Sequence, residues 1–159
     1  MLNDTDTLLR DTLAKARELM NSHGLQDWGI GYDNAVRRYG QCRHHDKTIT
    51  ISRKLTAVNP WMNTQDTILH EIAHALTPGT GHGREWQRVA KDIGCDGKRT
   101  YGGNVIQPPM PWTATCQICK TTAHKARRPS HSIACGACCR MYNSGVFDSR
   151  YAFEWVRSN

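Results

Sequence analysis

Residues 70–86, HEIAHALTPGTGHGREW, constrain this chain more than any other stretch. In a helix, His70 and His74 lie one turn apart on the same face, so both imidazoles can reach a single metal ion. Glu71 lies about 100° further round the helix, beside that ion. This is the H-E-x-x-H arrangement, in which two histidines hold zinc and the glutamate acts as general base toward an activated water. The stretch therefore predicts a hydrolytic metal centre; the alternative is a helix end that is merely rich in histidine.

A catalytic zinc also needs a third protein ligand and an open fourth position. Pro78, Gly79 and Gly81 end the predicted helix and let the chain reverse. His82 then returns toward the same ion at the start of the next helix, and it is our candidate for the third ligand. The alternatives for this position are Glu85, His44 and His45.

Hydrophobic periodicity predicts three main helices in the first 106 residues. Apolar side chains recur at helical spacing over residues 4–22, 63–77 and 83–93. Asp66 is placed in the first turn of the second helix, where a carboxylate can satisfy free backbone amides. Gly94 follows the third helix and suits its C-terminal cap.

Between the first two helices, the pattern changes to that of strands. In residues 48–52, TITIS, isoleucines alternate with hydroxyl residues, as in a half-buried strand. A partner strand is expected over residues 36–42, joined to the first by the polar turn HHDK. We therefore expect an α+β fold, with three main helices and a short antiparallel sheet.

The stretch VIQPPMPW has three prolines in eight residues and marks a domain boundary. We predict a catalytic domain over residues 1–106, a linker over 107–111 and a second domain over 112–159. Residues 1–106 carry 14 lysines and arginines against 12 acidic residues, whereas residues 107–159 carry 7 against 2. This uneven charge indicates an anionic partner for the second domain, with nucleic acid first; a solubilising surface is the alternative.

Four cysteines of the second domain form two couples, Cys116-x2-Cys119 and Cys135-x2-Cys138, with fifteen residues between them. This spacing is typical of a zinc ribbon, and four thiolates leave no open position, so that zinc would be structural. Cys139 is an alternative to Cys138 as a ligand. His124 and His131 are weaker alternatives, whereas Cys42 and Cys95 are expected to be unligated buried thiols.

Basic residues gather around these cysteines and are our candidates for contacts with phosphates. They are Lys120, Lys125, Arg127, Arg128 and Arg140. An exposed polar hairpin is the alternative interpretation. Tyr151, Phe153 and Trp155 alternate near the end of the chain; we expect them on the inner side of a last strand, although such rings can also stack on bases.

The hydropathy of the sequence and its first residues indicate the cellular compartment of the protein. It contains no run of 18 apolar residues, and its acidic beginning, MLNDTDTLLRDTL, is unlike a secretory signal. We therefore expect a cytoplasmic protein whose cysteines bind metal rather than form disulfides. The uneven charge adds an expected association with DNA, with single-stranded DNA as one candidate, and we expect a monomer. A zinc nucleobase deaminase does not fit, because Glu71 directly follows His70 and neither cysteine couple is preceded by proline.

HEIAHAL, GHGREW and the upstream segment RRYGQCRHHDKTITISRKL together resemble the SprT-like metalloproteases, a group whose members often carry a C-terminal zinc ribbon. The resemblance covers nearly all of residues 8–140. It implies a small zincin-like core in which His70, His74 and His82 bind the catalytic zinc and Glu71 is the catalytic glutamate. It makes Glu85 a helix residue rather than a ligand. The loop between the second and third histidines is shorter here than in some members.

The same resemblance implies an endopeptidase that cleaves DNA-bound or DNA-crosslinked proteins with little sequence preference, as in DNA–protein crosslink repair. Two zinc ions per chain, one catalytic and one structural, would be the cofactors. The competing hypothesis is a non-proteolytic, zinc-containing nucleic-acid-binding protein. Tyr101 is our candidate for stabilising the oxyanion of the reaction.

Overall fold

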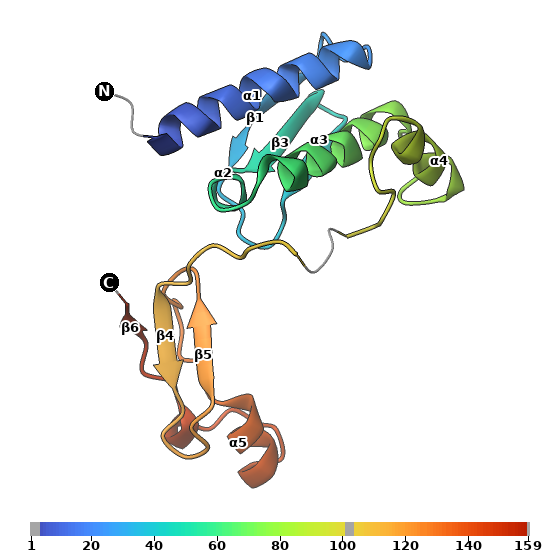
Figure 1. Ribbon diagram of the computed structural model, residues 1–159. Helices are drawn as coiled ribbons and strands as arrows, with labels where there is room; N and C mark the ends of the chain where they lie inside the picture. The colour runs from blue at the N-terminus through green and yellow to red at the C-terminus, as the bar shows by residue number, and fades with distance from the viewer. Residues whose placement is uncertain (1–3, 101–103, 159) are drawn as a thin grey trace. The chain divides into compact units, whose positions relative to one another are not determined.

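The computed structural model describes residues 4–100 and 104–158 and divides the chain into two compact units, Met1–Pro108 and Pro109–Asn159 (Figure 1). Each unit contains one three-stranded sheet, so the predicted α+β class is confirmed. No helix in the described part of the chain is long and apolar enough to cross a membrane.

The sheet of the first unit is mixed: the predicted antiparallel pair of strands is confirmed, but a parallel strand that we did not predict extends it. Its strands are β1 (Gly29–Asp33), β2 (Gly40–Arg43) and β3 (Thr48–Ser52), in the order β1-β3-β2. The β2–β3 hairpin is antiparallel, but β1 runs parallel to β3. β2 also begins four residues later than expected, because the Asp33 carboxylate accepts the Ala35 N–H at 2.9 Å and turns the chain after β1.

Among its described residues, four helices complete this unit: α1 (Asp4–Ser22), α2 (Arg53–Thr56), α3 (Trp61–Leu76) and α4 (Arg84–Asp92). The three predicted helices are confirmed, with α3 beginning two residues earlier than expected. Asp66 does not cap α3, which was a wrong expectation: its carboxylate accepts the N–H of Asp96 from the loop after α4. Gly94 follows α4 with a φ of 94°, which suits a helix C-terminus.

One hydrophobic core joins α1, α3, α4 and the strands of the sheet. Ile49 and Ile51 of the central strand β3 are fully buried, and so are Ile68 and Ile72 of α3. Because these pairs recur at strand and helix spacing, the same faces that the periodicity indicated are the buried ones. The core thus fixes α3, which carries the H-E-x-x-H motif, against β3 and next to the edge strand β2.

Asn59, in the turn before α3, clamps the end of the first unit. Its side-chain amide donates to the carbonyl of Ile106 at 2.8 Å, and its side-chain oxygen accepts the Ile106 N–H at 2.8 Å. The same amide also donates to the Leu55 carbonyl at 2.9 Å. Asn59 is buried but Ile106 is exposed, so the two bonds between them are partly shielded from water. Residue 106 is therefore tied to the turn before α3 just ahead of the proline-rich stretch.

Over residues 109–158, the second unit is a small antiparallel sheet with one α-helix and a short 3-10 helix. Its strands are β4 (Trp112–Thr115), β5 (Thr122–Lys125) and β6 (Val156–Arg157), in the order β5-β4-β6, and α5 spans Gly136–Tyr142. Its buried core consists of four cysteines and one tyrosine, with two partly buried neighbours. So little apolar burial cannot secure a fold of this size without a metal or a comparable crosslink.

The aromatic residues near the C-terminus do not form one continuous strand, which corrects our expectation. Tyr151 ends a short 3-10 helix, η1 (Ser149–Tyr151), and its ring is buried in the core of the unit. Phe153 is partly buried against that core, whereas β6 begins only after Trp155. The chain pairs at Ala152 with Ala134 in a single bridge instead.

Candidate metal centre and cleft

Three histidines converge on one point in the first unit. His70 and His74 come from one face of α3, and His82 comes from the residues just before α4. The Nε2 atom of His82 lies 3.1 Å from that of His74 and 3.1 Å from that of His70. Three nitrogens bound to one zinc in a tetrahedron lie about 3.3 Å apart, so this donor set fits a zinc ion.

The turn between α3 and α4 brings His82 to this point. The Thr77 hydroxyl donates to the Ala73 carbonyl at 2.7 Å and ends α3. Gly79 and Gly81 have φ angles of 79° and 56°, which favour glycine, and they reverse the chain within a few residues. A turn closed in this way holds His82 over the last turn of α3.

Trp86 forms the wall behind the three imidazoles. Its side chain is 0% exposed, and its ring centroid lies 4.6 Å from that of His70, 5.2 Å from that of His74 and 4.6 Å from that of His82. An indole in contact with all three rings restricts their rotation. Burial lowers the pKa of His70 and of His74 to about 4, so both are neutral at physiological pH, the form that binds metal.

Glu71 lies beside the histidines, at 7% exposure, on a cavity of about 520 Å³ that the three imidazoles also line. Burial raises the pKa of its carboxyl to about 7, and the backbone N–H of Cys42 on β2 opposes that shift. A carboxyl with such a pKa can both accept and release a proton near neutrality. The arrangement thus supplies a metal-binding donor set with an acid–base group next to it.

Gly40 on β2 makes room for this carboxylate. A Cβ atom at Gly40 would lie 2.6 Å from Oε1 and 2.7 Å from Cγ of Glu71, and 2.8 Å from Cγ2 of Thr67. All three distances are shorter than real contacts of a Cβ atom. Only glycine therefore lets the edge strand approach α3 closely enough for the Cys42 N–H to reach Glu71.

Replacing Gly40 by alanine is therefore expected to destabilise the first unit by about 1–3 kcal/mol, the usual cost of overpacking a close contact. Urea denaturation followed by tryptophan fluorescence measures this change. Gly31→Ala on β1 is the matched control, because a Cβ there would meet nothing within 4 Å. Equal stability of the Gly40 and Gly31 variants would contradict this close approach.

The other predicted ligands lie elsewhere. Glu85 is exposed on α4, and His45 is exposed in the β2–β3 turn. His44 lines the cavity, but its Nε2 lies 3.7 Å from the Cys42 sulfur, and it does not belong to a metal-binding group among the described residues. Tyr101, our candidate for the oxyanion, lies outside the described residues.

Comparison with known families agrees with this geometry: the model of the SprT-like family matches residues 11–105. The chain belongs to the SprT-like family. This is a family of predicted zinc metallopeptidases, and the match includes the three histidines and Glu71. Neither the curated proteins nor the solved structures compared with the chain include a match.

The second unit of this SprT-like protein gathers four sulfurs. The sulfur of Cys116 lies 3.6 Å from that of Cys138, and the sulfur of Cys119 lies 3.5 Å from that of Cys135. Sulfurs that share one tetrahedral zinc lie about 3.8 Å apart, so this donor set fits as well. The backbone N–H of Cys119 holds the pKa of the Cys116 thiol below its ordinary value, which favours the thiolate that binds zinc.

The remaining candidates in this unit lie outside that group. Cys139 is buried in the core, but it does not join the four-sulfur cluster. Nδ1 of His124 lies 3.2 Å from the Thr113 hydroxyl, and His131 is exposed; neither histidine joins a metal-binding group within residues 104–158.

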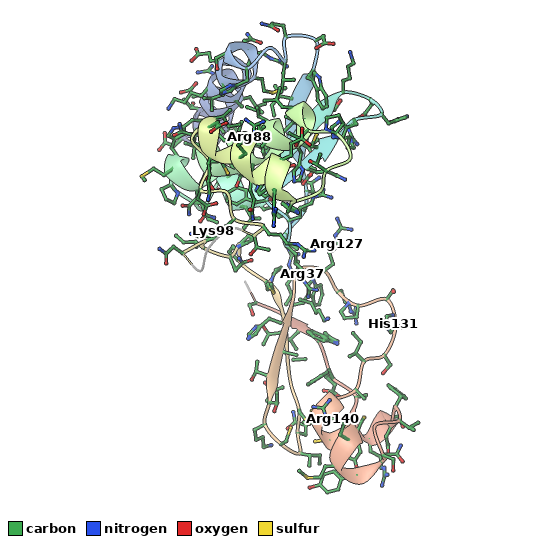
Figure 2. The ribbon with its side chains drawn as sticks, turned by 90° about the vertical axis from the view of Figure 1, so that its right-hand side faces the viewer. Arg37, Arg88, Lys98, Arg127, His131 and Arg140 are labelled. Carbon is green, nitrogen blue, oxygen red and sulfur yellow. The ribbon has the colours of Figure 1, made fainter. Side chains whose placement is uncertain are left out.

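The predicted phosphate-contacting residues of this SprT-like protein do not form one patch. Figure 2 shows Arg127 and Arg140 at opposite ends of the second unit. Lys120 lies between the couples in a left-handed conformation, with a φ of 59°, where it follows Cys119. Lys125 and Arg128, by contrast, meet at Trp112: Lys125 is its partner across β4 and β5, and the Arg128 guanidinium lies 5.6 Å from its ring centroid.

Sequence reasoning missed the residues that complete this group. Arg157 of β6 pairs in register with Trp112 on the other side of β4, so Lys125, Trp112 and Arg157 form one row across the sheet. Directly paired residues point to the same face of a sheet. Trp112 follows the prolines directly in the sequence, but Arg157 lies 45 residues further on, and no local pattern links the two residues.

Proposed function

We propose that this protein is a zinc-dependent endopeptidase that cleaves DNA-bound or DNA-crosslinked proteins, with Glu71 as general base. One observation supports the chemistry above all: the Nε2 atom of His82 lies 3.1 Å from those of His70 and His74, with a buried carboxylate on the same cavity. Membership of the SprT-like family supports the same reaction class.

His70, His74 and His82 would hold the zinc ion, which supplies a water of lowered pKa and an electrophile for the scissile carbonyl when it is bound. Glu71 accepts the proton of the attacking water and then donates it to the leaving amine. Its buried position on the same cavity as the three histidines suits both steps. The Cys42 N–H and the close approach of Gly40 hold the carboxylate in place during this exchange.

The nucleic-acid part of the proposal rests on the second unit. Lys125 and Arg157 pair with Trp112 in register from the two neighbouring strands, and the Arg128 guanidinium lies over its ring, so cations that can neutralise phosphates lie next to an aromatic side chain on which a base can stack. Binding there would hold the enzyme on the DNA that carries its substrates, which raises their local concentration.

The test is cleavage of a basic DNA-binding protein by the zinc-loaded enzyme, with no DNA, with single-stranded DNA and with duplex DNA. We expect cleavage that a chelator stops and added zinc restores, and that DNA accelerates. Failure to cut under every condition would leave a non-proteolytic, zinc-containing nucleic-acid-binding protein as the better description.

DNA binding has its own prediction. Replacing Arg128 and Arg157 by glutamine is expected to weaken binding to single-stranded DNA and to reduce the slope of log affinity against log salt by about 0.7 for each phosphate contact removed. Fluorescence anisotropy of a labelled oligonucleotide at several salt concentrations measures both. Arg88→Gln is the matched control, because this exposed arginine lies on α4 in the first unit (Figure 2). Equal slopes for all variants would refute the assignment of this surface.

A further inference from the structure

A second group of side chains lies next to the metal centre, and the proposed reaction does not use it. Ligand-type atoms of Asp66, Cys95 and Asp96 lie within 4.8 Å of one another. Asp66 precedes His70 by four residues on α3, so the two share one face of the helix, and both line the cavity. Cys95 and Asp96 belong to the loop after α4.

The polar atoms of this group bond to each other and to the loop. Asp66 Oδ1 accepts the Asp96 N–H at 2.8 Å, and the Cys95 thiol also hydrogen-bonds to Asp66. Asp96 Oδ1 accepts the Lys98 N–H at 2.8 Å, and Asp96 Oδ2 lies 3.1 Å from Lys98 Nζ. These hydrogen bonds account for the short distances within the cluster without a bound metal ion. Asp66 thereby holds the loop of residues 95–98 against α3.

The loop of residues 95–98 also forms a hydrogen bond with His70. The backbone carbonyl of Lys98 accepts a hydrogen bond from the His70 ring. Because Nε2 of His70 is the atom that faces His82 at 3.1 Å, the nitrogen that faces Lys98 is Nδ1. A metal-binding histidine commonly donates its other ring N–H to a carbonyl or carboxylate, which fixes its tautomer and orientation.

We propose that Asp66 is a positioning residue of the metal centre: it holds the 95–98 loop so that the Lys98 carbonyl keeps His70 in the Nδ1–H tautomer, with Nε2 toward His74 and His82. The inference rests on the proposed zinc site, but it does not depend on peptidase activity. It explains why the loop after α4 lines the same cavity as the motif histidines.

The test measures zinc affinity in the full chain by competition with a chromophoric chelator. For Asp66→Ala we expect the affinity of the histidine site to fall about 10- to 100-fold, as for other supporting partners of zinc ligands. Asp66→Asn keeps an oxygen acceptor at the same place and is expected to restore most of this loss. Asp92→Ala, which changes an exposed aspartate on α4, is the control, and the four-cysteine site serves as an internal reference.

A second measurement detects the tautomer of the His70 ring directly. In zinc-loaded wild type and Asp66→Asn, NMR should show a protected Nδ1–H proton on His70, and this signal should be lost or exchange rapidly in Asp66→Ala. If Asp66→Ala does not fold, Asp96→Ala, at an exposed loop position, tests the same chain of bonds and should also weaken zinc binding. Unchanged affinity and an unchanged Nδ1–H signal in the folded variant would overturn the proposal. Absent cleavage with this affinity pattern intact would instead refute only the peptidase function.

Discussion

Replacing Glu71 by glutamine is expected to lower kcat/KM for protein cleavage by about 10²- to 10⁴-fold, the usual contribution of a general acid–base group. Glutamine has nearly the same size, so it fits beneath Gly40, but its amide cannot accept the proton of the attacking water. Zinc content should stay at two ions per chain, because Glu71 is not one of the three converging donors. Cleavage kinetics and metal analysis of the same preparation measure both quantities.

Glu85→Gln is the matched control for this experiment. It makes the same chemical change on an exposed residue of the neighbouring helix, within the same seventeen-residue stretch. We expect its activity to equal that of wild type. Full activity of the Glu71 variant, or equal losses in both variants, would show that the buried carboxylate is not the base.

Replacing Cys138 by serine is expected to unfold the second unit and to lower the zinc content from two ions per chain to one. Serine is a poor zinc ligand, and the core of this unit consists mainly of the cysteines themselves. Zinc binding and folding are therefore one process in this unit. Loss of amide dispersion for residues 109–158 in NMR spectra, with the first unit unchanged, measures the effect.

Replacing Cys139 by serine distinguishes a role of this cysteine in zinc binding from a role in packing of the core. Cys139 is as deeply buried as its neighbour, but it lies outside the four-sulfur group. We expect this variant to keep both zinc ions and to lose only about 1 kcal/mol of stability, as a small polar change in a core. If instead the Cys139 variant lost the metal and the Cys138 variant kept it, the ligand assignment would be reversed.

Local sequence patterns predicted the helices well because the spacing of apolar residues within each helix marks the face that the helix buries. The spacing of Ile68 and Ile72 is enough to place α3, and tertiary packing shifted only its ends. The direction of β1 could not be predicted in the same way. A hairpin turn joins β2 to β3 and imposes antiparallel pairing, whereas β1 meets β3 through a connection that includes β2, and no local signal fixes its direction.

The three histidines could be predicted because helix spacing and one tight turn place them. Their supporting contacts could not, since they join segments about 30 residues apart. Asp66 appears in the sequence as a helix-start residue, yet it holds Asp96 from the loop after α4. Gly40 in a predicted strand was a weak signal of close backbone approach, and only the fold reveals that Glu71 fills the space.

The clamp at Asn59 has a mechanical consequence. If the second unit is held on DNA while the first unit engages a substrate, tension enters the first unit through residue 107. The two hydrogen bonds of 2.8 Å between Asn59 and Ile106, at the turn before α3, are the first contacts to carry this tension. The loop of residues 95–98, which supports His70, lies further from residue 107 along the chain than Ile106, so tension reaches that loop only after these two hydrogen bonds.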